Sequence, residues 1–282
     1  MRRSKWKNKA ALGLCLLLAL LCACGSGNTD EEQTSPSQED TLTYGDQTLP
    51  IQSSLAVNEY DGDLFVFDES GLCSYQGEGY VSMAGIDISA HQGEVDWQKV
   101  AAAGVEFVML RAGFRGYETG SLNLDSRFEE NIQGALEAGL QVGVYFFSQA
   151  VTVQEAREEA AFVLEAIDGY DVTLPVAFDG EYISDAEART DGVSSEELTR
   201  FAAAFCAAVE EGGCQAMVYF YVDLGYISYD LTQLREYGFW LSEYADSPSF
   251  YYHFSMWQYS NSGVIDGISE AVDLNIYLMM TQ

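Results

Sequence analysis

The chain has 282 residues, 48% of them hydrophobic, and a formal net charge of -31 at pH 7. This length and composition supply the core of one large domain or two small ones, and so acidic a surface excludes nucleic acid and anionic membrane surfaces as electrostatic partners. The chain has two histidines and no CxxC or His-rich spacing, so no metal and no cofactor is predicted.

The first 23 residues have the pattern of an export signal. Basic residues precede an apolar run, Ala10 to Ala23, that is too short to span a bilayer as a helix. The run leads into Leu21-Cys22-Ala23-Cys24, which resembles a bacterial lipobox and predicts cleavage before Cys24 and lipidation of its thiol. A multiply acylated Cys24 would hold the protein at the outer face of the bacterial cell membrane. An ordinary signal peptide, and hence secretion, is the alternative.

Two segments separate this signal from the regular part of the chain. Residues 24–40 are polar, acidic and aperiodic, which predicts a flexible linker. Residues 41–83 alternate short apolar pieces with turn signals, which predicts a small β-rich segment of one or two hairpins packed on the main domain.

Three cysteines follow Cys24, namely Cys73, Cys206 and Cys214. An odd number of thiols does not indicate a disulfide framework, so we expect buried thiols. A local bridge between Cys206 and Cys214 is the alternative.

From residue 84 onward, strand and helix patterns alternate. Strands are predicted at 85–88, 105–111, 141–147, 174–179, 215–221, 238–242 and 254–259, helices at 97–103, 125–138, 153–167, 194–211 and 231–237, and a last element at 271–278. The strands are continuously apolar, as is typical of parallel strands covered on both faces. This pattern favours an α/β barrel, and no GxGxxG follows the first strand to support dinucleotide binding. Residues 84–282 are fewer than the about 250 of a typical barrel, so we expect a modified, shortened β/α (TIM-like) barrel.

In such a barrel the functional side chains lie where the strands end. The strand at 174–179 ends in Asp179-Gly180-Glu181, whose two carboxylates share one face of an extended chain, roughly 6–7 Å apart. A pair of carboxylates is the usual catalytic group of glycoside hydrolases, although solvent-exposed strand ends often carry paired acids too. The other strand ends add acidic, polar and aromatic side chains: Asp87, Arg111, Tyr145, Tyr219, Tyr221, Trp240, Tyr244, Trp257, Gln258, Asp273 and Asn275. An acidic cleft lined with aromatics favours a sugar substrate.

An ordered set of motifs resembles glycoside hydrolase family 25, the muramidases or lysozymes of fungi, phages and bacteria. The motifs are Gly85-Ile86-Asp87-Ile88-Ser89, Val95-Asp96-Trp97, Asp179-Gly180-Glu181, Trp240 with Tyr244, Trp257-Gln258-Tyr259, Gly267-Ile268 and Val272-Asp273-Leu274-Asn275. The resemblance covers about residues 84–280.

This resemblance implies a modified β/α barrel that cleaves the β-1,4 bond between N-acetylmuramic acid and N-acetylglucosamine in peptidoglycan glycan strands. Glu181 matches the family's general acid and Asp179 the second carboxylate, as nucleophile or stabiliser. Asp87 and Asp273 match the acids that complete the cleft. The substrate-lining positions are matched by Tyr145, Tyr219, Trp240 and Trp257. Either role of Asp179 predicts retention of configuration.

Two residues depart from the family pattern. Gly180 lies between the acids where many relatives carry a bulkier residue, and Phe146 stands where many have His. Neither change removes a carboxylate.

Two other functions remain open. A chitinase-like glycosidase also ends a strand in DxE, but usually with further Asp residues where this chain has Ala177 and Pro175. The second is a non-catalytic cell-wall-binding lipoprotein. In each case we expect a monomer whose only membrane contact is the lipid anchor.

Overall fold

The computed structural model describes residues 40–183 and 187–281. The chain forms two units that divide between Ile51 and Gln52. In the first unit, β1 (Thr41–Tyr44) and β2 (Gln47–Pro50) form an antiparallel hairpin. The predicted signal peptide, the lipidation site at Cys24 and the linker up to residue 39 lie outside the described residues.

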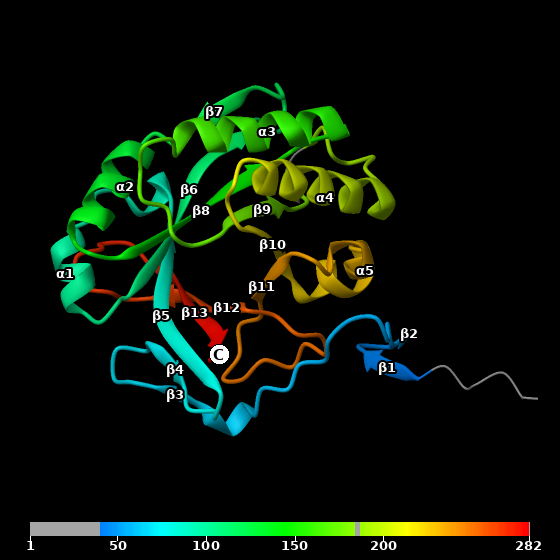
Figure 1. The fold of residues 1–282 in the computed structure, drawn as a ribbon, viewed down its shortest axis with the longest axis horizontal. Helices are drawn as coiled ribbons and strands as arrows, with labels where there is room; N and C mark the ends of the chain where they lie inside the picture. The colour runs from blue at the N-terminus through cyan, green and yellow to red at the C-terminus, as the bar shows by residue number, and fades with distance from the viewer. Residues whose placement is uncertain (1–39, 184–186, 282) are drawn as a thin grey trace, which may run out of the picture. The chain divides into compact units, whose positions relative to one another are not determined.

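Within the described part of the second unit, eight strands close into a barrel (Figure 1). They are β5 (Tyr80–Ile88), β6 (Phe107–Arg115), β8 (Gln141–Ser148), β9 (Val176–Gly180), β10 (Ala216–Tyr221), β11 (Gly238–Ser242), β12 (Met256–Gly263) and β13 (Val272–Met280). Each strand pairs with the next, and β13 returns to β5. The predicted β/α barrel is confirmed.

One strand contradicts the parallel arrangement that the apolar runs favoured. β13 is antiparallel to both of its neighbours, β12 and β5. The connection at residues 264–271 is shorter than the dozen or so residues that a parallel crossover needs, so the chain must turn back. A strand that is buried on both faces is continuously apolar whether it runs parallel or antiparallel to its neighbours, so the sequence pattern could not show the direction of β13. The long pairing with β13 also extends β5, which begins at Tyr80 and not at the predicted Gly85.

Helices cover the outside of the barrel (Figure 1). They are α1 (Trp97–Ala102), α2 (Phe128–Glu137), α3 (Val153–Ala166), α4 (Ser195–Glu211) and α5 (Leu231–Leu234). Each follows one strand of the series β5, β6, β8, β9 and β10, with α3 packed against α4. The connections at 243–255 and 264–271, described throughout, contain no helix, which explains how so short a chain closes a barrel.

Several short elements complete the second unit. They are the 3-10 turns Gly62–Leu64 and Ala90–Gln92, the strands β3 (Phe65–Phe67), β4 (Cys73–Tyr75) and β7 (Leu122–Leu124), and the π-helical turn Leu224–Ser228. β3 and β4 form a hairpin that packs on the barrel, with the ring of Phe65 5.0 Å from that of Trp257 and Phe67 5.3 Å from Tyr259.

Large side chains fill the barrel below its mouth. This cluster comprises Met83, Phe107, Met109, Leu174, Ala177, Met217, Trp240, Met256 and Tyr277, with Tyr145 and Tyr219 packed against it. The interior is therefore a packed floor and not a channel. Cys73, Cys206 and Cys214 are free thiols, as predicted. The first two are buried, whereas Cys214 is only partly buried, so the expected burial is wrong for this residue. No helix in residues 40–183 or 187–281 is both long and apolar enough to cross a membrane.

Candidate active site

A pocket of about 270 Å³ opens above this floor, at the carboxyl ends of the parallel strands and the amino end of β13. It is lined by Asp87, Tyr145, Asp179, Glu181, Tyr219, Trp240, Tyr244, Gln258 and Asp273. These residues come from seven barrel strands and from the segments that follow β9 and β11. The structure thus brings together all the predicted catalytic and substrate-binding residues except Trp257.

Trp257 lies outside this pocket because it points to the other side of β12. Its neighbour Gln258 lines the pocket, and successive side chains of a strand face opposite ways. The indole of Trp257 is completely buried against Phe65, and its Nε1 donates a 2.8 Å hydrogen bond to the Glu243 carbonyl.

The same alternation places the two acids of β9. Asp179 and Glu181 line the pocket, whereas Phe178 points outward and packs on Phe205 of α4 at 5.3 Å. Gly180 lies on that outer face, where a Cβ would stand 2.5 Å from Cε1 of Phe178 and 3.0 Å from the Tyr229 hydroxyl. This crowding explains the small residue between the acids.

Asp87 is held in place by two buried amides. Gln258 Nε2 and Asn275 Nδ2 donate to its Oδ2 at 2.8 and 2.9 Å, and the Asn275 Oδ1 accepts from the Trp240 indole at 2.8 Å. Burial raises the pKa of Asp87, and these hydrogen bonds oppose the rise. The carboxylate is therefore fixed in one orientation at the pocket wall.

Asp273 shares a hydrogen bond with Asp87. Burial, followed by the charge of Asp87 and this hydrogen bond, raises the pKa of Asp273 to about 8. At neutral pH one proton therefore lies between the two carboxyls, with Asp273 as the donor.

Burial also raises the pKa of the two acids of β9. The pKa of Asp179 lies well above its ordinary value because of burial and then the charges of Glu181 and Asp87, with Arg111 opposing. Burial and the charge of Asp87 raise the pKa of Glu181, while a hydrogen bond from Tyr219 opposes the rise. Such a pair titrates as a unit and retains a proton above the usual carboxyl range. Asp179 Oδ1 is buried without a hydrogen-bond partner among the described residues.

Gln258 links the acids to the hydroxyls around them. Its Oε1 accepts from Tyr219 at 3.1 Å, Ser242 at 2.9 Å and Tyr244 at 3.2 Å. The single Tyr219 hydroxyl proton is thus shared between Gln258 and Glu181. Gln258 and Asn275 were noted at strand ends but given no role in the site. The signal that could have assigned one to Asn275 is its position two residues after Asp273, on the same face of the strand.

Arg111, the cation whose charge acts on Asp179, is itself paired with another acid. Arg111 forms a 2.7 Å ion pair with buried Asp125, which also accepts the backbone N–H of Ala90 and Arg127. The charge of Arg111 lowers the pKa of Asp179 without neutralising the pocket.

Aromatic rings form both the floor and the rim. Tyr145 and Tyr219 meet the ring of Trp240 edge-on at 5.9 and 4.8 Å, which fixes all three. Tyr244 stands at the rim and is 54% exposed. Among the described residues, no group of three or more His, Cys, Asp or Glu could hold a metal ion.

The sequence matches the family model for glycosyl hydrolases family 25 over residues 86–268. The autolytic lysozyme of Clostridium acetobutylicum is 29% identical over 194 residues, which are 68% of this chain and 55% of that relative. The chain therefore spans only about half the length of this relative.

Solved structures share the fold. The spore cortex lytic enzyme SleM of Clostridium perfringens matches with a TM-score of 0.59 and 23% identity, over 70% of this chain and 67% of that one. The modular autolysin LytC of Streptococcus pneumoniae, solved with a synthetic peptidoglycan ligand, matches with a TM-score of 0.60 and 22% identity, over 82% and 53%. Because the family model covers more than half of the sequence, the chain belongs to glycosyl hydrolases family 25.

Proposed function

We propose that this protein is a peptidoglycan hydrolase, a muramidase that cleaves the β-1,4 bond between N-acetylmuramic acid and N-acetylglucosamine. The observation that carries the proposal is the pair Asp179 and Glu181 at one strand end, in a pocket closed by Asp87 and Asp273. The name of the lysozyme relative and the ligand of LytC support a peptidoglycan substrate.

Glu181 is the general acid of this mechanism. It follows the last residue of β9, is partly exposed in the pocket, and has a raised pKa, so it can carry a proton near neutrality. It protonates the glycosidic oxygen as the bond to the anomeric carbon breaks.

Asp179 stabilises the positive charge that develops on the sugar. Burial raises the pKa of both Asp179 and Glu181, so the pair shares a proton near neutrality. We propose that substrate binding moves this proton to Glu181 and leaves Asp179 anionic. Its free Oδ1 then either attacks the anomeric carbon or accepts the N–H of the substrate's N-acetyl group. Both routes retain the configuration.

The aromatic side chains bind the sugar rings. Tyr145, Tyr219 and Trp240 are the proposed substrate-binding residues, and their edge-on packing orients them before substrate arrives. Trp257 was predicted in the same role, but its buried position on the outer side of β12 supports a structural one.

The protein would work outside the cell, as a monomer, on the wall beside its membrane. The apolar run before Cys24 motivates a lipid anchor, and residues 24–40 a linker that lifts the barrel toward the wall. A lipid tether would replace the electrostatic attraction that a chain of charge -31 cannot have for an anionic wall. Cell fractionation tests this: Cys24→Ala should leave the membrane fraction, and retention there would contradict the anchor.

A wall-turbidity assay tests the proposed activity. Purified cell walls should clear with the wild-type protein and not with Glu181→Gln, while chitin should remain intact. Clearing by Glu181→Gln would contradict the assigned acid, digestion of chitin would favour a chitinase-like enzyme, and binding without clearing would favour a non-catalytic wall protein.

A further inference from the structure

Gln149 connects the general acid to a network outside the pocket. It directly follows β8, and its side chain is completely buried without lining the pocket. Its Nε2 donates 3.0 Å hydrogen bonds to the carbonyls of Glu181 and Ser148, and its Oε1 accepts from the Thr190 hydroxyl at 2.9 Å. One amide thus links the end of β9 to a residue just before α4.

These hydrogen bonds lie just beyond the point where the backbone pairing of β8 with β9 ends. The pairing of β8 with β9 reaches Ser148 and Gly180 and stops one residue before Glu181. The side chain of Gln149 therefore holds the carbonyl of Glu181 where no strand partner does.

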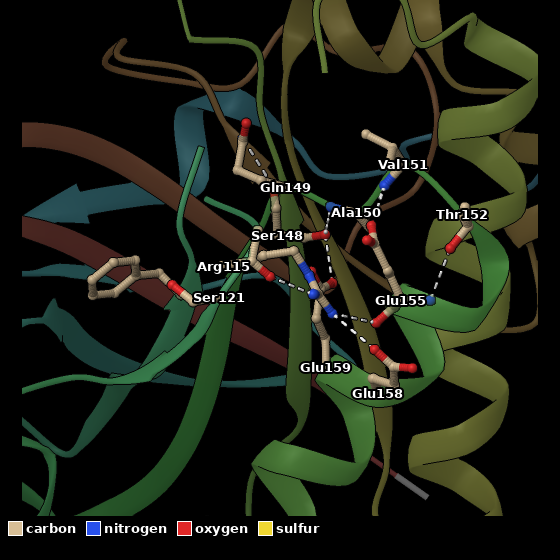
Figure 2. Close-up of polar contacts among 12 residues, drawn as sticks. Arg115, Ser121, Ser148, Gln149, Ala150, Val151, Thr152, Glu155, Glu158 and Glu159 are labelled. Carbon is tan, nitrogen blue, oxygen red and sulfur yellow. Dashed lines mark hydrogen bonds and ion pairs between the residues drawn. The ribbon is translucent and has the colours of Figure 1, made fainter. Parts of the chain in front are cut away.

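Gln149 is itself fixed from α3. Ser148 Oγ donates to buried Glu159 at 2.6 Å, and Glu159 pairs with Arg115 at 2.7 Å (Figure 2). The Gln149 carbonyl accepts from Arg189 at 3.3 Å, and Arg189 pairs with Glu155 at 2.7 Å.

The buried charges of this network are fully satisfied. Arg115 also donates to the carbonyls of Gly120 at 2.7 Å and Glu155 at 2.9 Å, so the pair with Glu159 leaves no uncompensated charge. A buried ion pair adds little net stability over an apolar replacement, and its best use is to fix geometry. Here it fixes the turn that carries Gln149.

We propose that Gln149 is a positioning residue that holds the backbone of Glu181 so that its carboxyl points into the pocket, with Thr190 and the Arg115–Glu159 pair as its supports. This inference rests on the proposed role of Glu181 as general acid. Gln149 does not touch the pocket, so its effect reaches the reaction only through Glu181.

The test compares four variants with the wild type on soluble peptidoglycan fragments. Gln149→Met keeps the length of the side chain and removes every polar contact. Thr190→Val removes the donor to Gln149, and Thr190→Ser restores it. Thr199→Val is the control, because the hydroxyl of Thr199 is also buried and makes two hydrogen bonds, to the Ser195 carbonyl and from the Asp230 N–H, neither of which bonds Gln149 or its supports.

A misplaced acid should lower kcat by about 10- to 100-fold in Gln149→Met, with KM little changed. The pH profile of kcat should shift as well, because the pKa of Glu181 depends on its surroundings. Thr190→Val should show a smaller loss that Thr190→Ser reverses. Thr199→Val should lower Tm and leave kcat and the pH profile unchanged. Should Gln149→Met not fold, the Thr190 pair makes the same comparison.

Wild-type kcat and pH profile in both folded Gln149→Met and Thr190→Val, with Glu181→Gln inactive, would overturn the positioning role alone. An equal loss of kcat in Thr199→Val would overturn it too, since the effect would then follow stability. Activity in Glu181→Gln would overturn the assigned acid and, with it, the role of Gln149.

Discussion

Asp87 and Asp273 are direct cross-strand partners on the antiparallel strands β5 and β13. Two ionised carboxylates at such a position repel one another. Burial and the charge of Asp87 raise the pKa of Asp273 to about 8, so the pair keeps one proton and is joined by a hydrogen bond. The contact between these two side chains at the seam of β5 and β13 therefore includes a proton.

The raised pKa of Asp273 makes the stability of the folded protein depend on pH. The carboxyl of Asp273 has a higher pKa in the folded chain than in the unfolded one, where it lies near 3.8. The folded state thus binds more protons between about pH 4 and 8, and its contribution to stability is present below this window and lost as pH rises through it. Tm should fall from pH 5 to 8.

The variant Asp273→Asn removes the titrating group and keeps its shape. Its Tm should fall less over the same range than that of the wild type. Asp266→Asn is the matched control, since it makes the same substitution at an exposed position in the connection before β13. Equal pH dependence of Tm in Asp273→Asn and Asp266→Asn would count against a shared proton.

Gly180→Ala should be destabilising. The added Cβ would meet the ring of Phe178 at 2.5 Å and the hydroxyl of Tyr229 at 3.0 Å, and overpacking of this kind costs about 1–3 kcal/mol. Urea unfolding should show this loss, together with lower activity because the strand carries both acids. Gly192→Ala meets open space and should leave both measurements unchanged. A Gly180→Ala variant with wild-type stability would contradict this prediction, because it would mean that Phe178 and Tyr229 can move aside at little cost in free energy.

Trp257→Phe and Trp240→Phe should separate stability from catalysis. Trp257→Phe loses the bond to the Glu243 carbonyl on the outer side of β12, so unfolding free energy should fall by about 1 kcal/mol with kcat and KM unchanged. Trp240→Phe frees Asn275, one of the two amides that fix Asp87, so kcat should fall. Chemical unfolding and steady-state kinetics on both proteins make the comparison. A raised KM in Trp257→Phe alone would restore it as a substrate-binding residue.

Much of this site could be predicted because it follows from alternation along single strands. The apolar run before Asp179 predicted a buried strand, and the spacing of Asp179 and Glu181 placed them on one face. The barrel then followed from the order of strands and helices, and it placed Asp87 at the same end. Asp273 was assigned from the family resemblance, and it reaches this end because β13 is antiparallel.

The parts that could not be predicted depend on which face or neighbour a residue meets in space. Trp257 and Gln258 are adjacent, so their side chains point to opposite faces of β12. The sequence does not show which of the two faces the inside of the barrel, and the structure shows that it is Gln258. The small size of Gly180 depends on Phe178 and Tyr229, and Tyr229 lies far along the chain. The direction of β13 depends on a short connection and not on its apolar residues.

The central claim is that Asp179 and Glu181 cleave the β-1,4 bond after N-acetylmuramic acid with retention. Proton NMR of the first products released from glycan fragments tests this most directly. The wild-type protein should release N-acetylmuramic acid reducing ends first as the β-anomer, with the α-anomer appearing later by mutarotation, and Glu181→Gln should release none. A first product with the α-configuration, or with N-acetylglucosamine at its reducing end, would contradict the account.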